Sequence, residues 1–129
     1  MIVSAVNVLT LDGPSGVGKG TVGVSMAKKL SYNYLDSGAL YRTLAVAAER
    51  WDVDLNDKKG LKKLANNLDI SFQAESASTI KPFLDGEDIT RELMLENTAS
   101  KASVLALYSE VRTALTARQR LFAISPGLI

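Results

Sequence analysis

A glycine-rich segment with a single lysine is the part of this sequence best suited to chemistry. The segment reads Gly13-Pro14-Ser15-Gly16-Val17-Gly18-Lys19-Gly20-Thr21. Glycines let successive backbone N–H groups turn toward one point, because no Cβ stands in the way. The segment therefore predicts a loop that binds phosphate groups, with the Lys19 ammonium following the β- and γ-phosphates of a nucleotide. The alternative is a flexible glycine turn with a solvated lysine.

The elements expected around this segment favour phosphate binding. Residues 7–11 form an apolar run that predicts a short buried strand. Residues 18–30 predict a helix. Its apolar residues Val22, Met26 and Leu30 are spaced four apart on one face. The N-terminus of such a helix adds roughly half a positive charge, and strand, glycine loop, lysine and helix is the order in which phosphate-binding loops are built.

The residue after the lysine departs from the usual form of such loops. Serine or threonine commonly follows the lysine and reaches Mg²⁺, whereas Gly20 here precedes Thr21. No direct protein ligand for Mg²⁺ is evident, so we expect coordination through water near Thr21. The Gly-Lys-Gly-Thr ending resembles that of the nucleoside monophosphate kinases rather than that of GTPases or motor ATPases.

The composition limits the chemistry that the chain can perform. Its 129 residues contain no Cys and no His, which excludes disulfides, thiol chemistry and imidazole bases. Catalysis must rest on Lys, Arg, Asp and backbone groups, which suits phosphoryl transfer because positioning and charge stabilisation do most of it. The formal net charge of +1 gives no electrostatic case for a nucleic-acid or membrane partner. The apolar N-terminus lacks the basic residues of a signal peptide, so we expect a cytoplasmic protein.

A second polar segment, Asp36-Ser37-Gly38-Ala39-Leu40-Tyr41-Arg42, follows a second expected strand at residues 32–35. Ligands of open α/β sheets collect at the carboxyl ends of strands, so this segment should face the same crevice as the phosphate loop. Ser37 with the helix N-terminus can bind an anion, and Arg42 can hold a phosphate bidentately. The alternative is a helix cap beside a surface arginine.

The order of elements predicts a small antiparallel piece within a parallel α/β frame. Strand, helix, strand and helix in residues 7–50 indicate a parallel sheet with covering helices. Residues 70–73 and 80–84 predict a hairpin, and Pro82 marks its second strand as an edge. The polar stretch Ser76-Ala77-Ser78 is the expected hairpin loop.

Helices account for most of the remaining sequence. The helix after Asp36 or Ser37, which can cap it, should extend to about residue 50. Its inward residues are expected to be Leu40, Leu44 and Ala47 or Ala48. A further helix starts at Asn56 or Asp57, with a solvated face of Lys58, Lys59, Lys62 and Lys63 and an inner face of Leu61, Leu64 and Leu68. Three more are expected at residues 90–97, 98–108 and 109–124, the last with Val111, Leu115 and Phe122 inward.

Two motifs together make the chain resemble a known family. Gly-Pro-Ser-Gly-x-Gly-Lys-Gly-Thr followed by Asp-Ser-Gly-Ala-x-Tyr-Arg looks like the bacterial type of cytidylate kinase. Weaker similarity continues through residues 84–89, 99–103, 111–120 and 126–129. The resemblance implies one domain over residues 1–129, an α/β P-loop kinase fold of three layers with a parallel sheet. It also implies a small antiparallel insertion within a monophosphate-binding segment at about residues 62–105.

The resemblance further implies a reaction, the transfer of the γ-phosphoryl group of ATP to CMP or dCMP with Mg²⁺. On this sequence, the loop 13–21 would hold the ATP phosphates, and Lys19 would stabilise the group in transfer. Ser37 and Arg42 match contacts to the CMP phosphate in the family.

Four further residues have less specific expectations. Ser103 and Arg112 match family positions that read the cytosine. A packed small residue and a solvated arginine are the respective alternatives. Asp36 and Tyr41 are expected to line the site.

The resemblance covers only a little over half of the family's usual length. The Asp-Gly-Arg-Asp motif, the arginine-rich lid and the adenine-binding segment of family members do not occur in these 129 residues. We therefore expect an incomplete kinase that is inactive and prone to self-association on its own. The full-length form is expected to be monomeric. In the family, the strand that starts at about Leu128 lies between the first two strands of the sheet. Two other interpretations stay open: another small-molecule kinase, such as one for shikimate or a sugar acid, and a nucleotide-binding fragment without turnover.

Overall fold

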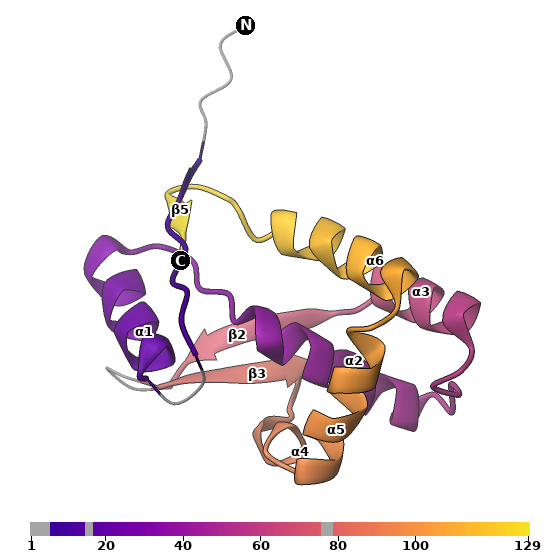
Figure 1. The fold of residues 1–129 in the computed structure, drawn as a ribbon. Coiled ribbons are helices and arrows are strands. Elements are labelled where there is room, and N and C mark those ends of the chain that lie inside the picture. Colours follow the sequence, from indigo (N-terminus) through magenta and orange to yellow (C-terminus); the bar gives the residue numbers. More distant parts are fainter. Residues whose placement is uncertain (1–5, 15–16, 76–78) are drawn as a thin grey trace, which may run out of the picture.

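The computed structural model describes residues 6–14, 17–75 and 79–129. The predicted loop residues Ser15 and Gly16 and the predicted turn Ser76-Ala77-Ser78 lie outside these residues. Figure 1 shows two small sheets connected through the central helix α2. The elements are β1 (Asn7–Val8), α1 (Lys19–Leu30), α2 (Ser37–Arg50), α3 (Lys58–Asn66), β2 (Ile70–Ala74), β3 (Ile80–Leu84), β4 (Glu87–Asp88), α4 (Thr90–Leu93), α5 (Glu96–Leu105), α6 (Ser109–Arg120) and β5 (Gly127–Leu128).

The parallel sheet places the first and last strands side by side. β1 pairs in parallel with β5, and the N–H of Leu9 extends the pairing by donating to the carbonyl of Leu128 at 2.9 Å. On the other side of β5, the N–H of Leu35 donates to the carbonyl of Ile129 at 2.8 Å. β5 therefore lies between β1 and residues 33–35, the strand order that the family resemblance implied. The α/β fold with a parallel sheet is confirmed.

The two N-terminal strands are shorter than predicted. The sequence predicted a buried strand over residues 7–11, but β1 ends at Val8 and all five residues are exposed. Residues 32–35 form a single parallel bridge, from Asn33 to Leu128. Both strands are short because their common partner β5 has two residues; among the described residues, β1 pairs with no other strand.

Helix α1 forms where expected but buries another face. The predicted apolar face was Val22, Met26 and Leu30, yet Val22 and Leu30 are about half exposed. The buried residues are Gly23, Val24 and Ala27. The cause is Tyr34, because its ring lies against Gly23 so closely that a Cβ there would stand 3.1 Å from Tyr34 Cε2. The lack of a side chain at Gly23 lets Tyr34 pack on this face, so this face is buried rather than the one with the large apolar residues.

Helix α2 forms the centre of the hydrophobic core. Its predicted inner face is confirmed, since Leu40, Leu44, Ala47 and Ala48 are buried. The helix contacts α3, α4, α5, α6 and β3. Because α2 begins beside β5 and crosses the molecule, it fixes the second polar segment relative to the phosphate loop (Figure 1).

The antiparallel sheet has the strand order β2–β3–β4. The hairpin of β2 and β3 is confirmed, but the prediction that Pro82 lies on an edge strand is wrong, because β3 is the middle strand. Proline is tolerated because its carbonyl accepts from the N–H of Ile89 at 3.1 Å, just past the end of β4. In this antiparallel pairing the missing N–H would have faced the carbonyl of Ile89. That carbonyl instead accepts from Leu93, at the end of α4.

The remaining helices follow the predicted pattern with shifted ends. Asp57 caps α3, and the four lysines of that helix are exposed as expected. The predicted helices 90–97 and 98–108 are α4 and α5, but α4 ends at Leu93 and α5 already begins at Glu96. The Thr98 hydroxyl connects the two helices by donating to the carbonyl of Glu92 at 2.7 Å. In α6, Val111 and Leu115 are buried, and Phe122 packs against the core just beyond the helix. Within the three described ranges, no helix has both the length and the apolar character needed to cross a membrane.

Candidate functional site

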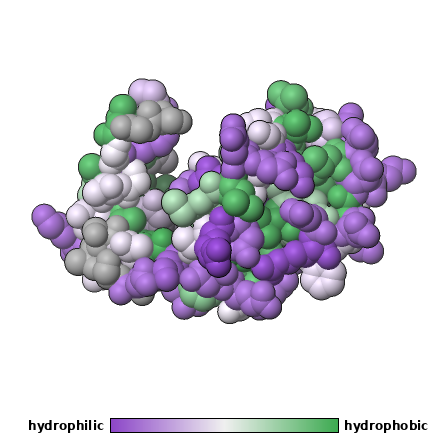
Figure 2. All heavy atoms as spheres, turned by 90° about the horizontal axis from the view of Figure 1, so that it is seen from below, coloured by the Kyte–Doolittle hydropathy of each residue, from purple (hydrophilic) through white to green (hydrophobic). Residues whose placement is uncertain are grey.

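Two adjoining cavities lie beside α1 and α2, one of them reaching the end of α6 and the other reaching the antiparallel sheet. The loop cavity, of about 930 Å³, is lined by the start of α1 and by residues 8–12. The hairpin cavity, of about 590 Å³, is lined by side chains of β2, β3 and the α4–α5 region. Figure 2 shows the surface hollowed between the part that carries α1 and the bulk of the molecule. The residues common to both cavities are Gly20, Thr21, Tyr34, Asp36 and Arg42.

The first turn of α1 presents backbone donors to the loop cavity. Gly18 precedes the helix with φ +88°, a left-handed conformation that glycine adopts without strain. The first helical hydrogen bond runs from the N–H of Val22 to the carbonyl of Gly18, at 3.1 Å. The N–H groups of Lys19, Gly20 and Thr21 therefore have no acceptor within the helix. These donors and the helix dipole make the turn a site for an anion.

Lys19 places its charge across the mouth of the glycine loop. Its ammonium donates to the carbonyl of Gly13 at 2.8 Å, and the N–H of Gly13 donates to Asp12 Oδ1 at 2.9 Å. An ammonium has three donors, so this bond leaves others for a ligand. Lys19 and Asp12 both line the loop cavity. The predicted meeting of lysine and helix N-terminus is therefore present in the structure.

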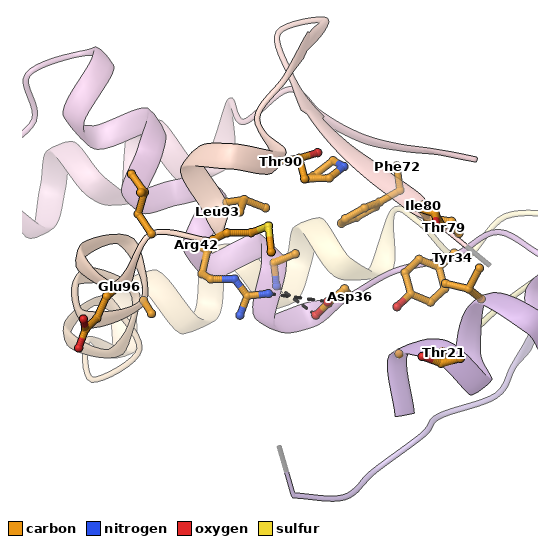
Figure 3. Close-up of a pocket in the computed structure, with 17 residues that line it drawn as sticks. Thr21, Tyr34, Asp36, Arg42, Phe72, Thr79, Ile80, Thr90, Leu93 and Glu96 are labelled. Carbon is orange, nitrogen blue, oxygen red and sulfur yellow. Dashed lines mark hydrogen bonds and ion pairs between the residues drawn. The ribbon is translucent and has the colours of Figure 1, made fainter. Parts of the chain in front are cut away.

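Asp36 and Arg42 join the start of α2 to both cavities. Asp36 Oδ1 accepts from the N–H of Ala39 at 3.1 Å, which caps the helix, and its Oδ2 lies 3.8 Å from Arg42 Nη2. Figure 3 shows this ion pair at the edge of the hairpin cavity. Gly38 makes room for the pair, since a Cβ on it would lie 3.3 Å from both Arg42 Nη1 and Asp36 Oδ1. The Arg42 side chain remains 34% exposed, so its guanidinium stays accessible to a ligand.

Replacing Asp36 by alanine should destabilise the chain by about 1 kcal/mol, because α2 loses its N-cap. The partly exposed pair with Arg42 adds little to that loss. Urea denaturation of the two proteins measures the difference. Asp36→Asn is the matched control, since asparagine caps a helix equally well. An alanine variant as stable as the wild type would contradict the capping role.

Tyr34 is a site residue that the sequence analysis missed. It lines both cavities, and its hydroxyl end points toward Thr21 (Figure 3). Burial, and secondarily the Asp36 carboxylate, raises the pKa of Tyr34 above its ordinary value of 10.0, so the phenol is neutral at physiological pH. Its place at the carboxyl end of an expected strand, two residues before Asp36, was the signal available in the sequence.

The other predicted residues are distributed unequally around the cavities. Ser37 is exposed and lines the loop cavity. Tyr41, which was expected to line the site, instead packs half-buried against the core and lines neither cavity, because its position on α2 turns it inward. Val17 is exposed beside Gly13 and also lines neither.

Ser103 and Arg112 lie outside both cavities. The Ser103 hydroxyl donates to the carbonyl of Ala99 at 3.1 Å, and Arg112 Nη1 lies 3.4 Å from the carbonyl of Ala106. Both residues are exposed. The nearest link to the site is Ala99, which precedes Ser103 by one turn of α5 and lines the hairpin cavity. The structure thus brings Arg42 and Ser37 to the phosphate loop but leaves the two expected base-reading residues apart from it.

Oxygen donors for a cation are few in the described part of the chain. Among those residues, no group of three or more Asp, Glu, His or Cys side chains is placed to hold a metal ion. Thr21 and Asp36 nevertheless face both cavities. Hydroxyl and carboxylate oxygens suit Mg²⁺, which keeps several waters when it accompanies phosphates.

Comparison with known proteins places this geometry in a wider context. The family model described as cytidylate kinase matches residues 9–129. Similar curated proteins named cytidylate kinase occur in Aliivibrio salmonicida, 52% identical over 122 residues, and in Vibrio cholerae, 50% identical over 122 residues. Each alignment covers 95% of this chain and 54% of the relative. A third, from Stutzerimonas stutzeri, is 46% identical over 99% of this chain and 56% of its own length. The chain spans about half the length of the curated relatives it matches.

Proposed function

Because the chain belongs to the cytidylate kinase family, we propose that it serves the transfer of the γ-phosphoryl group of ATP to CMP or dCMP. One observation carries the proposal beyond the family match. The anion-binding turn of α1 and the Arg42 guanidinium open onto adjoining cavities that share a wall. Two phosphate-bearing ligands bound there would bring their phosphates together, which is the geometry that phosphoryl transfer requires.

The loop cavity is proposed to hold the phosphates of ATP. The loop Gly13–Thr21 supplies backbone donors, of which those of Lys19, Gly20 and Thr21 start the helix. Lys19 would exchange its bond to Gly13 for a phosphate oxygen and neutralise charge on the group in transfer. Backbone donors fixed by a helix need no reorganisation during the reaction, so they stabilise the transition state without a further cost.

The hairpin cavity is proposed to receive the acceptor nucleotide. Arg42 lines both cavities and would bind the CMP phosphate where they adjoin, with Ser37 reaching it from the loop cavity. The ion pair with Asp36 orients the guanidinium. The cavity is bounded by residues of the segment 62–105, which we propose as the monophosphate-binding segment. Ser103 and Arg112 are proposed to read the cytosine on the strength of the family pattern.

Mg²⁺ is proposed as the accompanying cation. The donor set fits it through oxygen atoms, with Thr21 and Asp36 facing both cavities and water completing the coordination. When bound, the cation would neutralise charge on the donor phosphates.

Arg112→Ala should reduce discrimination among bases rather than the rate with CMP itself. An arginine that hydrogen-bonds a base edge leaves a site that accepts other bases more readily once it is removed. The ratio of kcat/KM for CMP to that for UMP and AMP measures the effect. An unchanged ratio would remove Arg112 from base recognition.

A panel of acceptors tests the proposed function. The protein that carries this chain is supplied with ATP, Mg²⁺ and one of CMP, dCMP, UMP, AMP or GMP, and nucleoside diphosphate formation is followed. We expect CMP and dCMP to be phosphorylated faster than AMP or GMP. Faster transfer to AMP than to CMP would contradict the assignment. Binding of ATP and CMP without transfer would reduce the function to nucleotide binding.

A further inference from the structure

Tyr34 is the one aromatic residue among the side chains shared by the two cavities. On one side its ring covers the glycine face of α1. A Cβ on Gly23 would lie 3.1 Å from Tyr34 Cε2, and a Cβ on Gly20 would lie 3.9 Å from the Tyr34 hydroxyl. Gly20 and Gly23 are one turn apart, so the ring lies flush against the helix that carries the phosphate loop. Its backbone is held by the bonds of its neighbours to β5.

On its other side, Tyr34 contacts the antiparallel hairpin. Its ring meets Phe72 of β2 edge to face, with centroids 6.1 Å apart and an interplanar angle of 88°. Phe72 in turn packs on Phe122 beyond α6, with centroids 5.9 Å apart. The edge-to-face arrangement is a favoured geometry for aromatic pairs. Tyr34 therefore contacts both α1 and the hairpin and connects the two.

The Tyr34–Phe72 contact also lies on the wall of a cavity. Phe72 lines the hairpin cavity but not the loop cavity, and it pairs with the strand that carries Ile80 and Pro82 on the same cavity wall. Figure 3 shows Tyr34 and Phe72 side by side along one edge of that cavity, with Arg42 opposite. Phe72 and the strand with which it pairs line the hairpin cavity alone, so a change at the Tyr34–Phe72 contact acts on that cavity. The first turn of α1 is fixed by its own hydrogen bond from Val22 to Gly18.

We propose that Tyr34 is a positioning residue, whose ring sets the hairpin at the distance from α1 and Arg42 that the acceptor nucleotide requires. The inference rests on the proposed function, since it concerns the acceptor of that reaction. It assigns the effect to the ring acting through Phe72, and not to the hydroxyl. Loss of the ring should weaken acceptor binding, whereas the donor nucleotide keeps its backbone contacts at α1.

Steady-state transfer from ATP to CMP in the protein that carries this chain tests the inference. We expect Tyr34→Leu to raise KM for CMP about tenfold while KM for ATP and kcat change by less than about twofold. Phe72→Leu should raise KM for CMP similarly. In the double variant, KM for CMP should rise by less than the product of the two single increases, because both substitutions remove the same contact. Phe72→Leu also carries the test if Tyr34→Leu fails to fold.

Two further variants separate this role from the alternatives. Tyr34→Phe retains the ring and should rescue the KM for CMP. Phe122→Leu removes an aromatic ring from the same cluster but lines neither cavity, so KM should stay at the wild-type value. An unchanged KM in Tyr34→Leu, a uniform fall in rate with both KM values unchanged, or a Tyr34→Phe variant as impaired as Tyr34→Leu would each overturn the inference. If the wild type phosphorylates CMP, that failure leaves the proposed function standing; a wild type that does not use CMP overturns both.

Discussion

Replacing Lys19 by alanine should lower the turnover of phosphoryl transfer by about 10²–10³-fold, which is the loss typical of removing one preorganised charge-stabilising donor. The ammonium already lies at the mouth of the loop, 2.8 Å from the carbonyl of Gly13, beside the N–H groups that begin α1. Its charge is most needed when the group in transfer is between donor and acceptor. Single-turnover rates at saturating ATP and CMP measure this step.

Lys29→Ala is the matched control for the Lys19 variant. Lys29 lies in the last turn of the same helix, is exposed and faces neither cavity. It should leave the rate unchanged, which separates the effect of one charge at the loop from that of net charge. A Lys19→Ala variant with a rate near that of the wild type would remove Lys19 from the mechanism.

Replacing Arg42 by alanine should raise KM for CMP by about 10- to 100-fold. A hydrogen bond to a charged group contributes about 1.5–3 kcal/mol, which corresponds to roughly 10- to 100-fold in affinity. KM for ATP should change little, because the backbone donors of α1 are untouched. Arg42→Lys should recover only part of the affinity, since lysine keeps the charge and loses the planar fork.

Arg50→Ala provides the control for Arg42. Arg50 ends the same helix and pairs with Glu87 at 3.3 Å, outside both cavities. Its loss should leave both KM values unchanged. If Arg42→Ala has the same KM for CMP as the wild type, the acceptor phosphate binds elsewhere.

The features that local sequence determines were predicted well. Asp36 and Asp57 cap α2 and α3 because a short acidic side chain reaches the N–H groups of the next turn, whatever the surrounding fold. The start of α1 directly after Gly18 was predictable for the same reason, since it depends on a few consecutive residues. The hairpin of β2 and β3 follows from two β-prone runs joined by a short polar stretch.

The features that depend on neighbours distant in the sequence were not predicted correctly. The buried face of α1 is set by Tyr34, so the apolar spacing of Val22 and Leu30 gave the wrong face. Pro82 occupies a middle strand because Ile89 uses its carbonyl in α4 and needs no donor from proline. Ser103 and Arg112 lie outside the cavities because of how α5 packs on α2 and α6 packs on α3, which the spacing of residues does not specify.

The central claim is that the turn of α1 and Arg42 bind two nucleotides whose phosphates meet. Calorimetric titration with a ligand that joins adenosine and cytidine through one chain of phosphates tests it most directly. If both sites are occupied at once, the joined ligand binds at least about 10²-fold more tightly than ATP or CMP, because the second contact becomes intramolecular. Lys19→Ala and Arg42→Ala should each remove most of that gain. A joined ligand that binds no more tightly than ATP, or whose affinity ignores Arg42, would contradict the account.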